Sequence, residues 1–409
     1  MSDWKKVKLS ECCLSIADGD HQPPPKAEQG IPFVTISNIT SANQFDFSNT
    51  LYVPQDYYDR LDEKRKAREG DVLYSVVGSF GIPVFMKENK EFVFQRHIAI
   101  LRPDSDAIIP QFLFYTMLTR DFYAKADAAA LGAAQRTVSL TSLRNIEINI
   151  PEKKVQLKIV EILSAFDNLI ENNQKQIKLL EEAAQRLYKE WFVDLRFPGY
   201  EDVQIVDGVP EGWEKRTLGE VLKVIRGRSY SSKELSDRQG VLMINLSNIR
   251  PYGGYNRDQE KRYTGKYTKE QVVKTHDLLM GVTDMTQERR TVGRVAIVPK
   301  ICEEAMISMD LIKLEPFNGS SLFYYGLLCY GGYSEVVSRF ANGTNVLHLR
   351  PDVLNIVDVI LPTEKLQQRF TSYFENLQDR IDVLQDQILL ATEARDRLLP
   401  KLMSSEIEL

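Results

Sequence analysis

The sequence starts a second time part-way along its length. "WKKVKLSEC" at Trp4–Cys12 returns as "WEKRTLGEV" at Trp213–Val221, 209 residues further on. "GIPFVTISNIT" at Gly30–Thr40 returns in the same way as "GVLMINLSNIR" at Gly240–Arg250. Further matching segments keep this order at similar offsets, up to "LTSLRNIEINIPEKKVQLKI" against "LRPDVLNIVDVILPTEKLQQRF". The chain is therefore a tandem duplication of a unit of roughly 200 residues.

The first part of each repeat, roughly 150 residues long, has the pattern of a mixed domain. Short apolar runs such as "VLYSVV" and "FVFQRHIAIL" are separated by glycine, proline, asparagine and aspartate, which predicts strands joined by turns. A few short helices are expected, one of them at "FLFYTMLTRDFYAK". The pattern predicts a curved sheet with some helix and leaves its topology open.

The second part of each repeat has the pattern of a long helix. Neither glycine nor proline intervenes from 152 to 192, and apolar residues recur there, and again from 364 to 399, at steps of three and four. Over about four heptads this spacing predicts a coiled-coil seam. The seam positions are Leu163, Phe166, Ile170, Asn173, Ile177, Leu180, Ala184, Leu187 and Trp191, and Phe370, Phe374, Leu377, Ile381, Leu384, Ile388, Ala391, Arg395 and Leu398. The polar members Asn173 and Arg395 are either register-setting positions or residues exposed near a helix end.

A single helix cannot bury such a seam, so the two helices are predicted to pair with each other. Because each follows an equivalent domain, an approximate two-fold axis would make them antiparallel. The predicted fold class is α+β: two tandem mixed domains separated by a two-helix antiparallel coiled coil, with pseudo-two-fold symmetry.

Composition excludes several classes of protein. With 43% hydrophobic and 27% charged residues, the 409-residue chain is expected to fold. No apolar run reaches the roughly 18–20 residues of a membrane span. The start "MSDWKKVKLSECC" lacks the apolar core of a signal peptide, and the four cysteines form no CxxC pair. We therefore expect a cytoplasmic protein without a membrane segment.

Catalytic and metal-binding motifs are missing from the sequence. It contains no GxxxxGK[ST], HExxH or GxSxG and no strand-linked GxGxxG, and its four histidines fall singly. "HQPPPK" is the nearest approach to the Asn/Asp-Pro-Pro-aromatic motif of amino-methyltransferases, but it lacks the first and last residues of that motif. We expect no catalytic centre, no metal site and no bound cofactor.

The two repeats differ most in three loops. These are "ADGDHQPPPKAEQ" against "IRGRSYSSKELSDRQ", "VVGSFGIP" against "VTDMTQERRTVG", and "LGAAQRTVS" against "ANGTNVLHL". The loops concentrate arginine, glutamine and asparagine, whose side chains can hydrogen bond to base edges. One interpretation is a pair of readers for one class of ligand with different sequence preferences. Ordinary loop drift after duplication is the other.

Charge alone does not decide whether the chain binds nucleic acid. The formal net charge of −5 argues mildly against a protein that coats nucleic acid unaided. The segment Arg226–Arg262 nevertheless has eight basic residues against four acidic ones. Phosphate contact and a solvated surface both remain open for this segment.

The whole chain resembles the DNA-specificity subunits of type I restriction-modification enzymes. The resemblance rests on "EWFVDLRFPGYE" with "GVPEGWEKRTLGEV", on the paired "SNI" segments, and on "LRNIEINIPEKKVQLKIVEILSAFDNLIENN". It implies target-recognition domains at 1–151 and 199–362, each reading one half of an asymmetric split DNA site. It also implies coiled-coil helices at 152–198 and 363–409 that set the spacer and dock two methylation subunits.

The resemblance further implies that the chain is not catalytic by itself. The methylation subunits would hold S-adenosylmethionine, and motor/nuclease subunits with ATP and Mg²⁺ would complete the complex. The two alternative classes are a self-sufficient methyltransferase or nuclease, and a two-headed coiled-coil scaffold that binds protein or glycan instead of double-stranded DNA.

The candidate DNA-binding residues come from the divergent loops. In the first repeat they are Asp20, His21, Gln22, Lys26, Ser79, Phe80, Gln95, Arg96, Gln135, Arg136 and Thr137. In the second they are Arg226, Arg228, Ser229, Tyr230, Gln287, Arg289, Arg290, Arg294, Asn345 and His348. Some of these residues are expected to contact phosphates, which position a protein on DNA without specifying sequence.

Overall fold

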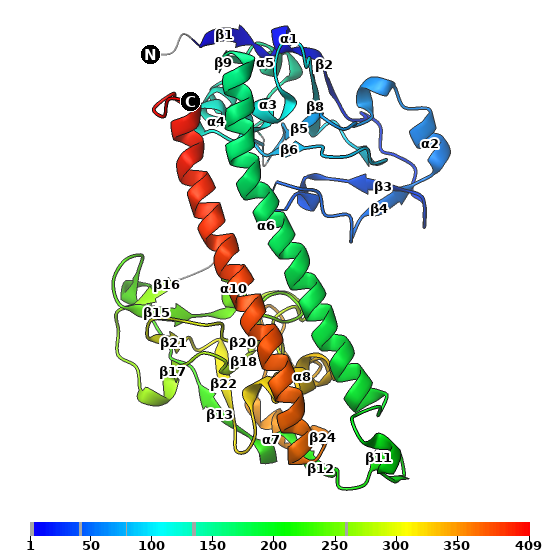
Figure 1. Ribbon diagram of the computed structural model, residues 1–409, viewed down its shortest axis with the longest axis vertical. Helices are drawn as coiled ribbons and strands as arrows, with labels where there is room; N and C mark the ends of the chain where they lie inside the picture. The colour runs from blue at the N-terminus through cyan, green and yellow to red at the C-terminus, as the bar shows by residue number, and fades with distance from the viewer. Residues whose placement is uncertain (1–3, 41–42, 79, 133–135, 258–260) are drawn as a thin grey trace. The chain divides into compact units, whose positions relative to one another are not determined.

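The computed structural model describes residues 4–40, 43–78, 80–132, 136–257 and 261–409 (Figure 1). The chain forms two compact units. Unit 1 consists of Met1–Glu171 together with Leu389–Leu409, and unit 2 of Asn172–Ile388. Each of the two long helices, α6 (Lys153–Tyr188) and α10 (Glu364–Met403), therefore contributes residues to both units.

Unit 1 combines short strands with short helices before α6. Its strands are β1 (Lys5–Lys8), β2 (Cys13–Asp18), β3 (Ile31–Val34), β4 (Leu51–Val53), β5 (Val72–Ser75), β6 (Pro83–Phe85), β7 (Val93–Phe94), β8 (Ile98–Pro103) and β9 (Glu147–Ile150). Its helices are α1 (Leu9–Cys12), η1 (Ile36–Asn38), α2 (Gln55–Asp59), η2 (Glu63–Arg65), α3 (Pro110–Met117), α4 (Arg120–Ala128) and α5 (Leu140–Arg144).

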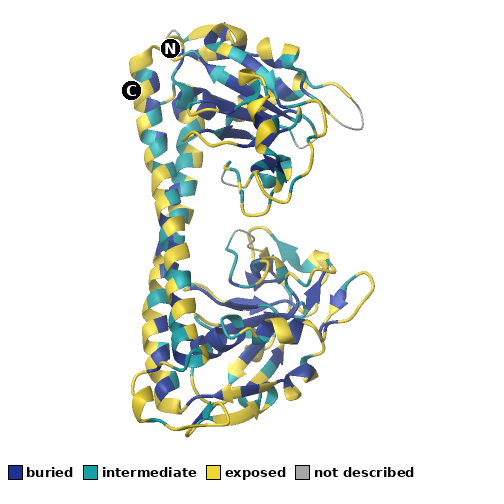
Figure 2. Cartoon of the chain, turned by 90° about the vertical axis from the view of Figure 1, so that its right-hand side faces the viewer, coloured by how far each residue is buried: buried dark blue, intermediate teal, exposed yellow. Residues whose placement is uncertain are grey.

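The core of unit 1 is a four-stranded antiparallel sheet in the order β2-β8-β5-β6. β8, "IAILRP", is an almost uninterrupted apolar run, as expected of a strand covered on both faces. A second sheet, β4-β3-β7, pairs β3 with β7 in parallel, and β1 pairs with β9. Figure 2 shows the core strands as largely buried.

Unit 2 repeats this organisation. Its strands are β10 (Ile205–Val206), β11 (Val209–Pro210), β12 (Glu214–Thr217), β13 (Leu222–Arg226), β14 (Leu235–Ser236), β15 (Val241–Ile244), β16 (Lys261–Tyr263), β17 (Val272–Val273), β18 (Leu278–Gly281), β19 (Thr283–Asp284), β20 (Val295–Ile297), β21 (Ala305–Ile307), β22 (Leu311–Pro316), β23 (Leu347–His348) and β24 (Asp358–Leu361). Its helical segments are η3 (Lys189–Val193), η4 (Tyr200–Asp202), α7 (Leu218–Val221), η5 (Ser232–Glu234), η6 (Leu246–Asn248), η7 (Lys269–Gln271), α8 (Ser321–Cys329), α9 (Tyr333–Ser338) and η8 (Pro351–Asn355).

The core sheets of the two units correspond strand for strand, whereas the second sheet has three strands in unit 1 and five in unit 2. β13-β22-β18-β20 repeats the order of β2-β8-β5-β6, and β12-β24 repeats β1-β9. β15 pairs with β21 in parallel, as β3 does with β7. The tandem duplication and the α+β class predicted from the sequence are confirmed.

Within each unit, α6 and α10 run antiparallel. In unit 1 Ile159 and Leu163, near the start of α6, share a core with Leu402, near the end of α10. In unit 2 Tyr188 and Trp191, at the end of α6 and just beyond it, pack on Phe370, near the start of α10. None of the seam residues named above is exposed.

The two polar seam positions have partners in the structure. Asn173 is 2% exposed, and its side-chain amide donates to Gln387 Oε1 at 2.9 Å. Arg395 donates to the Asp167 carboxylate at 2.9 Å, and the other oxygen of that carboxylate accepts from the Tyr115 hydroxyl at 2.6 Å. Neither Asn173 nor Arg395 is exposed, so exposure near a helix end does not describe them, and a register-setting role stays a prediction.

One predicted helix is divided in two. The stretch "FLFYTMLTRDFYAK" forms α3 and α4, because Thr119 has an extended backbone and its side chain caps α4 by accepting from Phe122 N–H. Threonine at an N-cap competes with helix continuation by offering this acceptor.

Candidate nucleic-acid interface

The divergent loops of unit 1 leave one end of its core sheet. β2 ends and β8 begins there, since Asp18 pairs with Ala99. β5 ends and β6 begins at the same end, since Ser75 pairs with Ile98 and Tyr74 with Pro83. The connections 19–30 and 76–82 therefore begin at this end of the sheet, and the connection 86–97 finishes there.

Unit 2 uses the equivalent end of its own sheet. Arg226, the last residue of β13, pairs with Ile312 at the start of β22, and Gly281, the last residue of β18, pairs with Leu311. β20 begins at Val295, opposite Met280. The loops after β13 and β18 thus leave the sheet at the same place as their counterparts in unit 1, although their sequences differ.

Backbone bonds join the loops of unit 1 to one another. Asp20 bridges Gln95: its N–H donates to Phe94 O at 3.0 Å, and its carbonyl accepts from Arg96 N–H at 3.1 Å. A second bridge joins Val77 to Thr137, and Gly78 N–H donates to Arg136 O at 3.1 Å. The structure therefore brings together sequence-predicted residues from separate loops.

Two equivalent glycines permit this close approach. A Cβ on Gly19 would lie 2.1 Å from Phe94 O, and one on Gly227 would lie 1.9 Å from Ser308 O. These distances exclude any side chain, so glycine is required where the first loop of each unit crosses its neighbour. Neither glycine was among the sequence candidates.

The Asp20 side chain is engaged inside the protein. Its carboxylate accepts from the Tyr57 hydroxyl and from Arg65 Nη1 at 3.2 Å. Burial raises the pKa of Asp20, but the bonds from Tyr57 and from backbone N–H groups outweigh burial and lower it overall. Asp20 therefore shapes the loop that presents the exposed His21 and Gln22.

An arginine and two aromatic rings cluster at the second loop of unit 1. Phe80 stacks on Tyr123 with ring centroids 5.6 Å apart, and the Arg136 guanidinium lies 5.9 Å from the Phe80 ring. Arg136 also pairs with Asp127 at 2.5 Å. Tyr123 is 46% exposed and was not predicted. The candidates Ser79 and Gln135 lie outside the described residues.

In unit 2, three arginines of the basic segment are occupied by ion pairs. Arg250 pairs with Glu181 on α6 at 2.6 Å, Arg262 with Glu303 at 2.8 Å, and Arg257 with Asp386 on α10. Within the described ranges, Arg226 and Arg228 form no such pair and are exposed. The charge available to a ligand is therefore smaller than the sequence count and is concentrated in the first loop.

A buried carboxylate organises the second loop of unit 2. Asp284, 2% exposed, accepts from the backbone N–H groups of Thr286 at 2.8 Å, Thr291 at 2.6 Å and Val292 at 3.4 Å, and from the Thr286 hydroxyl at 2.8 Å. Burial raises the pKa of Asp284, but these bonds outweigh burial and lower it overall. The carboxylate fixes the turn that carries Gln287.

The same loop is joined to the third divergent loop. Gln287 Nε2 donates to Thr344 O at 3.0 Å, and Thr283 pairs with His348 across β19 and β23. Gln287, Asn345 and His348, chosen from two separate sequence segments, thus belong to one continuous surface, and all three are exposed.

The remaining candidates are accessible to different degrees. Exposed ones are Lys26, Arg96, Arg136, Ser229 and Arg290. Partly buried ones are Asp20, Phe80, Gln95, Thr137, Tyr230, Arg289 and Arg294. No described candidate is buried.

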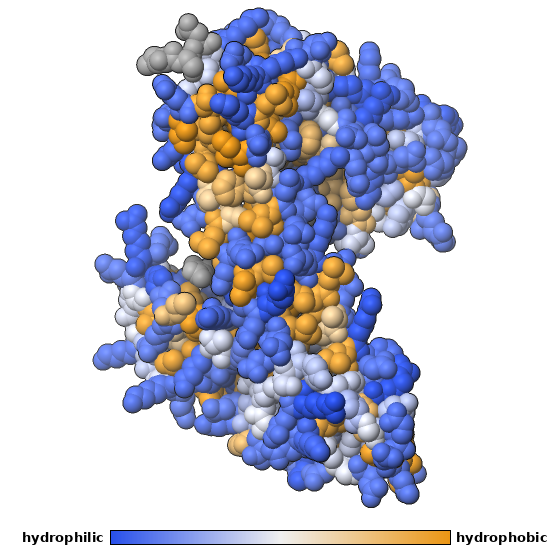
Figure 3. Space-filling view, viewed as in Figure 1, coloured by the Kyte–Doolittle hydropathy of each residue, from blue (hydrophilic) through white to orange (hydrophobic). Residues whose placement is uncertain are grey.

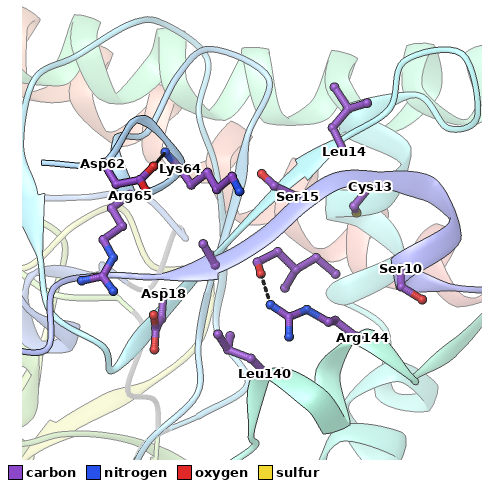
Figure 4. Close-up of a pocket in the computed structure, with 12 residues that line it drawn as sticks. Ser10, Cys13, Leu14, Ser15, Asp18, Asp62, Lys64, Arg65, Leu140 and Arg144 are labelled. Atoms are coloured by element: carbon purple, nitrogen blue, oxygen red, sulfur yellow. Dashed lines mark hydrogen bonds between the residues drawn. The ribbon is translucent and has the colours of Figure 1, made fainter.

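A hollow of about 510 Å³ lies beside β2 (Figure 4). Its walls carry Lys64, Arg65 and Asp18, and Arg144 Nη2 donates to Ile16 O at 2.6 Å. This bond covers part of the free edge of the sheet, where unpaired backbone groups would otherwise be open to another strand. No sequence candidate lines the hollow.

The described ranges also bear on metal binding and on membrane insertion. They hold no group of three or more histidine, cysteine, aspartate or glutamate side chains placed to bind a metal ion. Their helices are all too short or too polar to traverse a lipid bilayer.

Comparison with known proteins identifies the family. Residues 1–182 and 210–393 match the Type I restriction modification DNA specificity domain. The chain belongs to this family. The two matched stretches follow the duplication, one in each repeat.

Named members of the DNA specificity family are similar over most of their length. The MjaIX specificity subunit of Methanocaldococcus jannaschii is 27% identical over 74% of this chain and 70% of its own. The putative MjaX specificity subunit of the same organism is 26% identical over 99% of this chain and 94% of its own. The crystal structure of the type I system S subunit from M. genitalium superposes with a TM-score of 0.62 at 16% identity, covering 98% and 96%, so the fold is shared.

Proposed function

We propose that each unit of this DNA specificity protein reads one half of an asymmetric, bipartite site in double-stranded DNA. The observation that carries the proposal is the placement of the divergent loops. In both repeats the scaffold is the same, and the loops that differ leave one end of the core sheet. There the first loop bridges the segment before β8 or β22, and the second loop is bonded to the third. A shared frame with different exposed polar residues is suited to two readers with separate preferences.

The exposed side chains have the chemistry that base reading requires. Arginine can form two hydrogen bonds to guanine, and glutamine or asparagine can do the same with adenine. Unit 1 presents Gln22, Arg96 and Arg136, and unit 2 presents Arg228, Gln287 and Asn345. The sets differ in composition, which supports different half-site sequences.

The long helices are proposed to set the spacer and to dock two methylation subunits. When Pro151 is aligned with Pro362, Leu179 of α6 and Leu390 of α10 occupy equivalent positions of the two repeats. These leucines are 64% and 66% exposed, and Figure 3 shows apolar side chains reaching the surface over α10. An apolar position presented once in each repeat supports two copies of one partner bound in the same manner.

In this proposal the chain supplies sequence recognition and no catalysis. S-adenosylmethionine would belong to the methylation subunits, and ATP and Mg²⁺ to motor/nuclease subunits of the full complex. The fold likeness and the family support this division of roles, and the sequence offers no catalytic motif of its own.

The test measures binding with each half-site varied separately. The DNA site is first mapped from the methylated adenines of a host that expresses the chain with its methylation subunit. The affinity of the assembled complex is then measured for fluorescent duplexes in which the first or the second half of that site is scrambled. Arg96→Ala should weaken binding when the first half is intact and change nothing when that half is scrambled, and Arg228→Ala should do the same for the second half. Each lost base contact should cost about 1–3 kcal/mol.

The matched control is Lys215→Ala, an exposed basic residue on β12 paired with Asp358. It should leave the affinity for every duplex unchanged. If scrambling either half has no effect on the wild-type complex, the chain does not read a bipartite site, and a scaffold for protein or glycan becomes the better hypothesis.

A further inference from the structure

The turn "RPYGGYN" in unit 2 carries a residue in an unfavourable conformation. It joins a short antiparallel hairpin in which Ile249 pairs with Tyr255, and Gly253 N–H donates to Arg250 O at 3.0 Å. Pro251 is the second residue of this turn and Tyr252 the third, with φ of +68°. Proline fixes φ near −65° at the second position and φ is positive at the third, so the turn is of type II, whose third position favours glycine. A tyrosine there costs about 1–2 kcal/mol.

The framework does not demand this tyrosine. Unit 1 contains the same hairpin, with Ile39 paired to Phe45 and Asn43 N–H donating to Thr40 O at 3.0 Å. Counting along the two sequences from these pairs, the residue at the position of Tyr252 is Ala42. Tyr252 also gains little from burial, because it is 60% exposed and joins none of the hydrophobic clusters of the described chain. Burial of the side chain in a hydrophobic cluster therefore does not explain the strain.

The ring stands among arginines of the second candidate loop. Tyr252 N–H donates to Arg290 O at 2.7 Å, which ties the turn to that loop. The Arg294 guanidinium lies 5.6 Å from the ring centroid, in the range of a cation–π contact. The neighbouring Gly254 N–H donates to Val295 O at 2.8 Å, at the start of β20. The turn therefore lies at the end of the core sheet where the candidate DNA-binding residues lie.

We infer that Tyr252 is a DNA-contacting residue of the second half-site, and that its ring packs against the sugar and base edge of one nucleotide. This inference rests on the proposed function of the loops. Aromatic side chains contribute to nucleic-acid binding by stacking and apolar contact, which every base permits. Arg294 holds the ring from the protein side, and the exposed part of the ring is left for the nucleotide.

Two substitutions separate a binding role from a structural one. Tyr252→Gly removes the ring and at the same time relieves the backbone, and Tyr252→Phe keeps the ring and removes only the hydroxyl. In the complex with the methylation subunit, Tyr252→Gly should weaken binding to the mapped duplex about 5- to 150-fold. It should change nothing when the second half is scrambled, and Tyr252→Phe should bind as the wild type does. The thermal midpoint of Tyr252→Gly should be unchanged or raised.

The control is Tyr200→Ala, a 41% exposed tyrosine of η4 that is not part of the candidate loops. It should leave the affinity for DNA unchanged. The inference is overturned if Tyr252→Gly binds the intact site as the wild type does, if its loss is the same on the scrambled duplex, or if its thermal midpoint falls. A wild-type complex that ignores both half-sites would instead overturn the proposed function.

Discussion

Replacing Asp284 with alanine tests whether one buried carboxylate holds the second divergent loop of unit 2 in place. Asp284→Ala removes the acceptor of three backbone N–H groups and one hydroxyl. A hydrogen bond to a charged group contributes about 1.5–3 kcal/mol to stability. A buried donor left without an acceptor destabilises the loop by the full free energy of its desolvation. Thr286 and Thr291 are only partly buried, so water can replace some of the lost hydrogen bonds and reduce the loss of stability. We expect the local stability of the loop to fall by about 2–4 kcal/mol.

Amide hydrogen exchange of the complete chain measures this change directly. A loss of about 2–4 kcal/mol raises the opening equilibrium of the loop about 30- to 900-fold, which should appear in the amides of Thr286, Thr291 and Val292. Asp284→Asn keeps one acceptor oxygen and should have an intermediate effect. Exposed Asp237, changed to alanine, should leave these amides unaffected.

The pH dependence follows from the direction of the pKa shift. The pKa of Asp284 is lowered in the folded chain, so its contribution is complete above the unfolded value of about 3.9 and is lost as the pH falls through the lower folded value. The same amides should therefore lose protection in acid in the wild type and show no such loss in Asp284→Ala. Wild-type exchange rates in Asp284→Ala at neutral pH would refute this account of the loop.

The other predictions concern the helices and the core that they complete. Leu179→Asp or Leu390→Asp should each remove one methylation subunit, because burial of a leucine in the interface contributes about 1.5–3 kcal/mol to binding. Native mass spectrometry should then count one copy of that subunit instead of two. Two retained copies would exclude these leucines as docking sites. Asn173→Leu should raise the free energy of unfolding in urea by about 1 kcal/mol and allow more than one helix register, seen as mixed association states by light scattering. Asp167→Ala should lower that free energy by about 2–3 kcal/mol because it strands the Tyr115 hydroxyl, whereas Asp167→Asn keeps an acceptor and should lose less. A seven-residue insertion after Asn173 should change the spacer in mapped methylation sites, and altered half-sites would contradict it.

The sequence predicted the parts of the fold that follow a period. Matching segments such as "SNI" identify the duplication, and steps of three and four identify the buried faces of α6 and α10. Sheet order was out of reach, because strands of two to six residues carry too little pattern to pair. The end of the sheet at which the loops meet follows from that order and could be found only in the structure.

The candidate site was predicted by composition, and composition does not reveal internal partners. Arg257 counts as a basic loop residue in the sequence, yet its partner Asp386 lies 129 residues away on α10. Tyr252 has no periodic signal, and its unusual feature is a backbone angle. Gly19 and Gly227 occupy equivalent places after β2 and β13, so an alignment of the repeats could have found them.

The division of each long helix between the two units has a consequence for how the chain is made on the ribosome. The core of unit 1 contains Leu402, and the unit is completed by Leu389–Leu409, which is separated from Glu171 by the 217 residues of unit 2. At about 5–20 residues per second, translation takes roughly 10 to 45 s to cover that distance. During this interval the first-made domain has an open apolar flank where α10 will later pack. Nascent chains of this protein should therefore engage holding chaperones until the last helix emerges.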